Sequence, residues 1–310
     1  MKRITIIQSF LFLLLTTLGV INNLSSQNTA DFSVFNHSLN LINPAFTGKN
    51  NQTQIASNYK KVWAGIENSI HSNIISFSMP TQKGIGIGAA VITDNFYLFK
   101  ETTISGDISY KVKLNVAHEL LFGLKASAKF FGANFNNVKT FENNDPLFTK
   151  NEQVVLPNFS LGFAIRNERY FVHFSMLDIL KERKNNTEKV GVSNVMRTNF
   201  GAGIYHKLTD YLGVTTTSLF RVIQGVPLSF DISSMLSINN KYDFGLTYRY
   251  NAALMGNFLI KTTDWLQLGY SYGAPLNEIA KYNNGTHEFF IRIYFNKKTK
   301  NPFKWRLGCF

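Results

Sequence analysis

Apolar and polar residues alternate with a period of two through most of this chain, most clearly between residues 241 and 295. In residues 242–250 every second side chain is apolar or aromatic, with small, polar or charged side chains between. The pattern returns in residues 265–273 and 286–295. Such a strand has one apolar face and one polar face. Each stretch has about ten residues, the length a tilted strand needs to cross a bilayer, so we predict membrane-spanning strands.

The same pattern predicts about fourteen strands. Their expected ranges are 54–63, 71–80, 85–95, 102–114, 119–132, 156–166, 170–177, 197–207, 211–222, 228–238, 242–250, 254–261, 265–273 and 286–295. An even number of antiparallel strands can close into a barrel whose two ends lie on the same side. The predicted fold is therefore all-β, a transmembrane antiparallel outer-membrane β-barrel of about fourteen strands that spans residues 54–296.

The predicted connections differ in length according to their position in the chain. Those after even-numbered strands are short, and those after odd-numbered strands tend to be longer, with the longest at 133–155, 178–196 and 274–285. Tight turns on the periplasmic side and long loops outside are typical of outer-membrane barrels. If the first strand runs outward, both termini lie in the periplasm of a bacterium.

The two ends of the chain differ from the repeated strand pattern. Residues 1–26 are typical of a secretory signal peptide, with Lys2 and Arg3, an apolar stretch at 10–20 and small residues at its end. Residues 27–53 are expected to be a periplasmic segment leading into the barrel, because Asn-Pro and a nearby Gly favour a turn. Residues 297–310 are expected to form a C-terminal periplasmic tail.

Composition narrows the function classes. The chain of 310 residues is 45% apolar and 14% aromatic but only 16% charged, and its mean hydropathy is close to zero. A helical membrane protein would be much more apolar, whereas half of each barrel strand faces water. The net charge of +13 first suggests nucleic acid. The basic residues are scattered and no nucleic-acid-binding motif accompanies them, so anionic lipid or a basic lumen explains the charge better.

Placing the apolar face against lipid puts charged residues in the lumen. A Lys or Arg that faces lipid near the midplane would destabilise the barrel by about 2–4 kcal/mol, so charged residues are expected on the lumen face. We expect opposite charges to pair across the wall, with a transport site as the alternative. The predicted lumen-facing charged residues are Asp107, Glu119, Lys125, Lys129, Arg221, Asp231, Arg249, Glu288 and Arg292.

Catalytic and metal-binding patterns are weak. His287-Glu288 lacks a second His at helical spacing, so it is not a zinc protease motif. The closely spaced Gly84, Gly86 and Gly88 enter a strand instead of opening a helix, which favours close packing or a bend over phosphate binding. Cys309 is the single cysteine and excludes a disulfide framework. We predict no catalytic residue, cofactor or metal.

Several motifs follow one another in order over nearly the whole mature chain and include Asn43-Pro44-Ala45-Phe46-Thr47-Gly48, Trp63 and the glycines at 84–88. The most specific lie near the end, at Tyr270 and His287. Together these motifs resemble the PorP/SprF family of outer-membrane proteins associated with type IX secretion. Gly273 stands where the family commonly has Asp, and Lys60-Lys61-Val62 where it has Arg and Gln before Trp.

The resemblance implies a non-enzymatic role in export, in anchoring a secreted partner at the cell surface, or in both. Implied partners are a secreted protein with a type IX C-terminal domain, such as an adhesin, and periplasmic ring and peptidoglycan-binding components, besides outer-membrane lipid. Loops longer than a turn requires are often functional. Candidate partner contacts in the long loops are Phe141, Phe148, Lys181, Arg183 and Tyr282. The alternative function is a channel for a small anionic or amphipathic solute.

Overall fold

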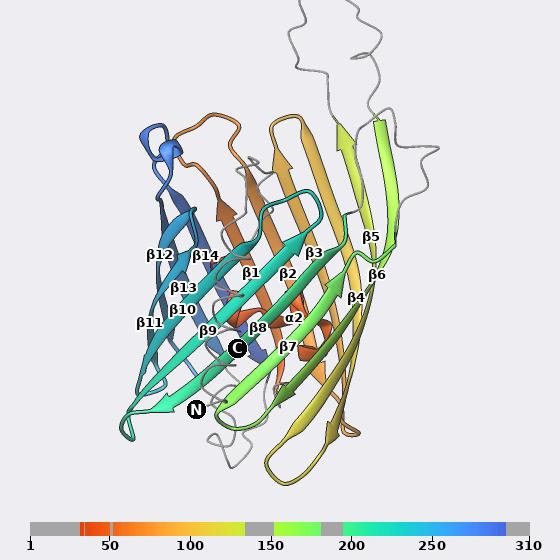
Figure 1. Cartoon of the computed structure of the whole chain (residues 1–310), viewed down its shortest axis with the longest axis vertical. Coiled ribbons are helices and arrows are strands. Elements are labelled where there is room, and N and C mark those ends of the chain that lie inside the picture. The colour runs from red at the N-terminus through yellow and green to blue at the C-terminus, as the bar shows by residue number, and fades with distance from the viewer. Residues whose placement is uncertain (1–31, 34, 50–51, 134–151, 181–194, 296–310) are drawn as a thin grey trace, which may run out of the picture.

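The computed structural model describes residues 32–33, 35–49, 52–133, 152–180 and 195–295, and they form a closed barrel of fourteen antiparallel strands (Figure 1). Each strand pairs with its neighbours in the chain, and β1 closes the barrel against β14. The strands are β1 (Thr53–Lys61), β2 (His71–Pro80), β3 (Ile85–Phe96), β4 (Phe99–Lys113), β5 (Glu119–Ala133), β6 (Glu152–Arg166), β7 (Tyr170–Leu177), β8 (Arg197–Lys207), β9 (Leu212–Ile223), β10 (Ser229–Ile238), β11 (Tyr242–Arg249), β12 (Ala253–Lys261), β13 (Leu266–Pro275) and β14 (Thr286–Phe295).

The predicted fold class is confirmed, and a strand lies at each of the fourteen predicted places. The main difference is at one end of β3 to β6, where β4 and β6 begin earlier than the alternation indicated. Phe96, Phe99 and Phe131 pack together there, with ring centroids 5.5 to 6.3 Å apart. This aromatic contact supports the longer strands, and a pattern of alternation contains no information about it.

The outer surface of the barrel is apolar. Ile75, Leu124 and Phe159 on neighbouring parts of the wall are more than half exposed, and their strand neighbours on either side turn inward. Tyr110, Tyr248, Tyr270 and other aromatic residues stand on the same surface. A band of apolar side chains with aromatic residues is the surface that lipid requires. Among the described residues, no helix is long and apolar enough to cross a membrane.

The two ends of the barrel differ. One end, here called the turn rim, carries the connections 81–84, 114–118, 167–169, 208–211, 239–241 and 262–265. The other, the loop rim, carries 62–70, 97–98, 134–151, 178–196, 224–228, 250–252 and 276–285, including the short helix η3 (Glu278–Lys281). The loop rim is at the top of Figure 1. The connections at 97–98 and 250–252 are as short as those of the turn rim. The length of the connections therefore distinguishes the two rims only in part.

The described residues 32–33 and 35–49, which precede β1, lie inside the barrel. Three short helices, η1 (Phe35–His37), α2 (Leu39–Ile42) and η2 (Pro44–Phe46), cross the lumen (Figure 1). We call the described residues 32–49 the plug segment. Residues 27–53 are expected from the sequence to be a periplasmic segment leading into the barrel. Those that the structure describes do lead into β1, but they lie within the lumen. Asn, Pro and Gly signalled turns, but the backbone groups that turns leave unpaired are satisfied here by the inner wall.

Candidate functional site

The last part of the plug segment is the sequence Asn43 to Gly48, which the sequence pattern predicts to be a turn. The Asn43 side-chain oxygen accepts a hydrogen bond from the Ala45 amide at 2.9 Å, and Pro44 occupies the first turn of η2. Asn is a favoured cap and Pro a favoured first residue because neither leaves a donor unpaired. The Asn43 side-chain nitrogen donates to the carbonyls of Phe163 and Phe174, both at 3.1 Å. One side chain therefore starts the helix and fastens it to β6 and β7.

Glycines in the wall let this helix approach the strands. A Cβ on Gly123 would lie 2.1 Å from the Ala45 nitrogen, and one on Gly162 would lie 2.0 Å from Asn43 Oδ1. A Cβ on Gly86 would lie 2.1 Å from the Thr47 carbonyl oxygen. Close backbone approach is a common reason for Gly in a strand. The glycines of β3, β5 and β6 thus form a track on which the plug segment lies.

Apolar side chains of the plug segment complete the core inside the barrel. Phe35, Leu39 and Phe46 are at most 4% exposed and belong to one cluster with wall residues that include Leu121 and Phe171. Phe46 meets Phe171 and His173 edge to face, with centroids 5.7 and 5.4 Å apart. Burial of one large apolar side chain contributes about 1.5–3 kcal/mol, so these three favour the plugged state substantially.

Polar wall groups satisfy the backbone of α2. The Lys125 ammonium donates to the carbonyls of Asn40 and Leu41 at 3.3 and 3.2 Å, and it lies 3.6 Å from Asp107. Ser175 and Asn199 donate to the next carbonyl, that of Ile42, at 2.6 and 3.1 Å. The last carbonyls of a helix have no partner within it, and here the wall supplies the donors.

The two ends of the plug segment are held by further wall residues. The Ser33 amide donates to Glu288 at 2.8 Å, and Arg292 donates to the His37 carbonyl. At the far end, Ser109 donates to the Thr47 carbonyl at 2.5 Å, and the Thr47 hydroxyl donates to Asp107 at 3.4 Å. Of the charged residues that alternation directed inward, four therefore contact the plug segment: Asp107, Lys125, Glu288 and Arg292.

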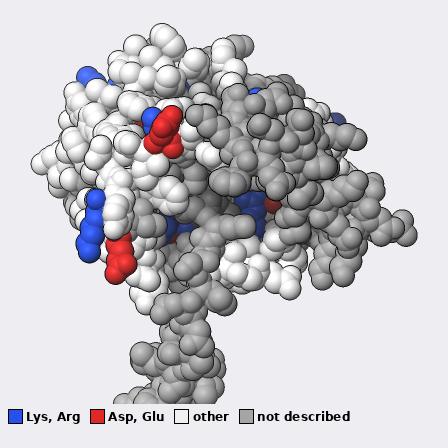
Figure 2. Space-filling view, turned by 90° about the horizontal axis from the view of Figure 1, so that it is seen from above, with Lys and Arg blue, Asp and Glu red and all other residues white. Residues whose placement is uncertain are grey.

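The other five predicted lumen-facing charged residues form ion pairs between adjacent strands. Asp231 on β10 lies 2.9 Å from both Arg221 on β9 and Arg249 on β11. Glu119 lies 2.9 Å from Arg166 and 3.6 Å from Lys111, and Lys129 lies 3.1 Å from Glu101. Asp231 is fully buried, and a buried carboxylate is tolerated because both of its neighbours carry positive charge. Figure 2, which views the loop rim, shows Lys and Arg atoms inside the central hollow.

Sequence reasoning missed several residues that hold the plug segment. Arg166, Ser175 and Asn199 were not among the candidates, although alternation within β6, β7 and β8 turns each of them inward. Arg166 donates to the Lys49 carbonyl at 3.2 Å as well as pairing with Glu119. The signal that could have found them is the strand pattern itself, applied to neutral polar residues as well as to charges.

The partner-contact candidates are only partly within the described residues. Phe141, Phe148, Lys181 and Arg183 lie outside them. Tyr282 is 77% exposed on the loop rim. The rim there is ordered by backbone hydrogen bonds, since Ala64 donates to the Gly285 carbonyl at 2.9 Å and Asn284 donates back to that of Ala64 at 2.7 Å.

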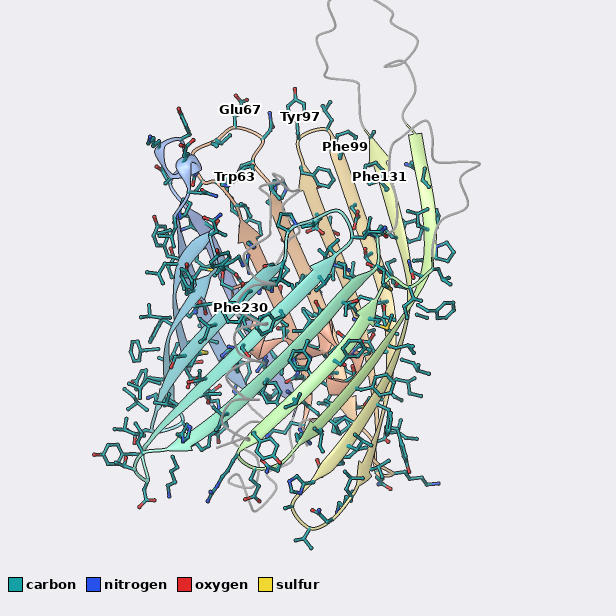
Figure 3. All side chains as sticks on the ribbon, viewed as in Figure 1. Trp63, Glu67, Tyr97, Phe99, Phe131 and Phe230 are labelled. Atoms are coloured by element: carbon teal, nitrogen blue, oxygen red, sulfur yellow. The ribbon has the colours of Figure 1, made fainter. Side chains whose placement is uncertain are left out.

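Of the family-motif residues beyond the plug segment, Trp63 and His287 lie near the loop rim, whereas Tyr270 lies in the middle of β13. Trp63 follows β1 in a left-handed conformation with φ of 55°. Figure 3 shows it near Glu67, with Tyr97, Phe99 and Phe131 further around the rim. On the lipid side, the Tyr270 hydroxyl lies 2.7 Å from His287 Nδ1. These aromatic and histidine side chains are suited to the boundary between lipid and water.

One ion pair sits where β7 meets the loop rim. Burial raises the pKa of the Asp178 carboxyl, but Arg197 and the more distant Lys129 and Lys125 outweigh it, so the pKa lies below its usual value. Arg197 is 2.8 Å from Asp178 and 39% exposed at its side chain. Asp178 also adopts a φ of 57°, a conformation that Asp tolerates better than most residues.

No group of three or more His, Cys, Asp or Glu within the described ranges is arranged to hold a metal ion. The described inner wall is built from paired charges, hydroxyls and amides that face a peptide segment. These groups are suited to binding the backbone of a polypeptide.

Solved structures with similar folds are outer-membrane barrels. The structure called CymD monoaromatic hydrocarbon channel matches with a TM-score of 0.52 and 10% identity, covering 87% of this chain and 95% of that one. A Pseudomonas aeruginosa FadL homologue matches with a TM-score of 0.47 and 9% identity, covering 84% and 94%. At such identities the likeness concerns the fold alone. No curated protein matches the chain.

The family comparison covers most of the chain. The model of the family described as "Type IX secretion system membrane protein PorP/SprF" matches residues 24–293. The match includes the plug segment, all of the barrel up to the last strand, and the motifs on which the resemblance rested. The chain therefore belongs to the PorP/SprF family of type IX secretion system membrane proteins.

Proposed function

We propose that this barrel is a non-enzymatic component of type IX secretion that aids export, or holds a secreted partner protein at the cell surface, or does both. The observation that carries the proposal is the plug segment, which is fixed to the inner wall by its backbone along its whole described length. A barrel with a fixed peptide across its lumen is suited to presenting its rims to other proteins. Its family membership supports the same role.

The wall contacts argue against free diffusion of solutes through the barrel. The plug segment is tied to β4 and β5, to β7 and β8, and to β14 on the other side of the lumen. A solute would have to pass between it and a wall whose predicted inward charges already bind one another or the plug segment. A small-solute channel, the alternative expected from the sequence, would need this segment to move first.

The loop rim is the proposed contact surface for the secreted partner. It carries exposed apolar and aromatic side chains, namely Ile66, Tyr97, Leu276 and Tyr282. Exposed aromatic residues on a surface of fixed shape are common anchors in protein interfaces. The backbone pairing of residues 64 and 284–285 fixes the shape of one part of this rim. The turn rim is then left for periplasmic components of the secretion machinery.

The test is to tag the chain in its native host, extract it in mild detergent and identify copurifying proteins by mass spectrometry. We expect near-stoichiometric recovery of a secreted protein with a type IX C-terminal domain, or of secretion-ring components. A variant with Tyr97→Ser and Tyr282→Ser should recover less of the secreted partner. Tyr211→Ser is the matched control, because Tyr211 is 57% exposed on the turn rim. A barrel that is recovered alone under gentle conditions would contradict the proposal.

A further inference from the structure

The plug segment has a direction through the barrel, and its first described residues lie near the loop rim. The Phe32 ring lies under the ammonium of Lys60, 5.6 Å from it, and the Ser33 amide donates to Glu288. Lys60 is one residue before the end of β1, and Glu288 pairs with it directly across the strands. Both residues therefore stand just below the connections 62–70 and 276–285 of the loop rim.

The middle of the plug segment lies at mid-height. The Asn36 side chain accepts a hydrogen bond from Thr217 at 2.7 Å, and Thr217 is near the centre of β9. Lys125, which donates to Asn40 and Leu41, is likewise near the centre of β5. The segment has thus descended from the rim by the time it forms α2.

The last residues of the plug segment lie near the turn rim. The Gly48 amide donates to Ser78 at 2.7 Å, and Ser78 is close to the connection 81–84. The Lys49 carbonyl accepts from Arg166, which is the final residue of β6 before the connection 167–169. From here the chain enters β1, which runs back up to the loop rim.

We infer that the plug segment is threaded through the lumen from the loop rim to the turn rim, so that the mature chain enters the lumen from the loop-rim side, at Phe32. The two ends of the mature chain are then not equivalent, in contrast to the expectation from the strand number that both lie on the turn side. The even number of strands determines only that β1 begins and β14 ends at the same rim. A segment inside the barrel can still connect the start of β1 to the opposite rim.

Epitope accessibility tests this inference. A short epitope is inserted between Ala30 and Asp31, and reference epitopes are placed at Tyr97 on the loop rim and at Ala117 on the turn rim. Antibody that cannot cross the outer membrane is added to intact cells and to cells with a permeabilised outer membrane. We expect the N-terminal epitope to behave as the Tyr97 epitope does. Behaviour matching the Ala117 epitope overturns the inference, whichever rim faces outward.

A cross-linking experiment covers the case in which the epitope prevents folding. In a Cys309→Ser background, Phe32→Cys is combined either with Lys60→Cys near the loop rim or with Lys83→Cys on the turn rim. A short bismaleimide should join the first pair in the folded barrel and leave the second pair unjoined. The reverse result overturns the inference. Because neither experiment involves a partner protein, failure here is distinguishable from failure of the proposed secretion role.

Discussion

The glycine track gives the sharpest prediction about how the plug segment is held. In Gly123→Ala the new methyl group would lie 2.1 Å from the Ala45 nitrogen and 2.2 Å from the Pro44 carbonyl carbon. Because close-packed atoms cannot approach so near, η2 must move by on the order of 1 Å. That movement loosens the packing of the buried Phe46 and the hydrogen bonds of Asn43.

The expected magnitude follows from these contacts. Overpacking costs about 1–3 kcal/mol, and each weakened hydrogen bond about 1 kcal/mol. The gain of about 0.5–1 kcal/mol that Ala gives over Gly through the unfolded chain affects global unfolding, and it leaves docking of the plug segment unchanged because β5 stays folded. We therefore expect Gly123→Ala to destabilise docking of the plug segment by about 1–3 kcal/mol.

Limited proteolysis of the detergent-folded barrel measures this effect, with the cleavage rate within residues 32–49 as the readout and thermal unfolding as a second one. Gly106→Ala on β4 is the matched control, because a Cβ there meets nothing within 4 Å. We expect faster cleavage in Gly123→Ala, by about tenfold for 1.4 kcal/mol when opening is fast, and no change in Gly106→Ala. Equal cleavage rates in the two variants would refute the proposed close contact.

Three further predictions concern charge. Asp178→Asn should lower the thermal stability at pH 7 by an amount within the usual 0.2–1 kcal/mol of partly exposed pairs. Since the pKa of Asp178 is lowered, its contribution to stability is present above about pH 4 and lost as pH falls through the folded-state pKa. The thermal stabilities of the variant and of the parent should thus become equal in acid. A stability difference that did not change with pH would exclude the ion pair with Arg197 as its cause. Asp231→Ala leaves the buried Arg221 and the partly buried Arg249 without their shared partner. It should cost about 3–5 kcal/mol in denaturant unfolding, and a loss below 1 kcal/mol would contradict this expectation. Leu124→Arg puts a charge on the lipid face near the middle of β5 and should cost about 2–4 kcal/mol in refolding into lipid vesicles, whereas a neutral effect would show that the strand register is wrong.

The alternation of side chains predicted the barrel because each strand faces lipid on one side and the lumen on the other. In β14 it directed Glu288 and Arg292 inward, and the structure buries both almost completely. Alternation says which face a side chain takes but not what lies opposite. The plug segment was therefore not predicted. Besides Asn58 on the neighbouring strand, Glu288 accepts from the Ser33 amide, a backbone group more than 250 positions away.

The glycines illustrate the same limit. Gly86 and Gly88 indicated close packing or a bend, and the structure shows close packing against Thr47. The sequence Asn43 to Gly48 indicated a turn, and η2 does turn the chain. Neither pattern shows that the two meet, because docking depends on the closed shape of the barrel. Residues near the loop rim, such as Phe96 and Phe99, were placed outside or at the ends of strands because their packing is equally nonlocal.

We expect the plug segment to close the lumen and to leave the rims free to bind other proteins. The most direct test is the conductance of the purified wild-type barrel in a planar lipid bilayer, with insertion verified by protease protection of the strands. We expect the wild-type protein to produce no stable conductance steps. A steady open conductance from the wild-type protein would contradict it and favour a solute channel.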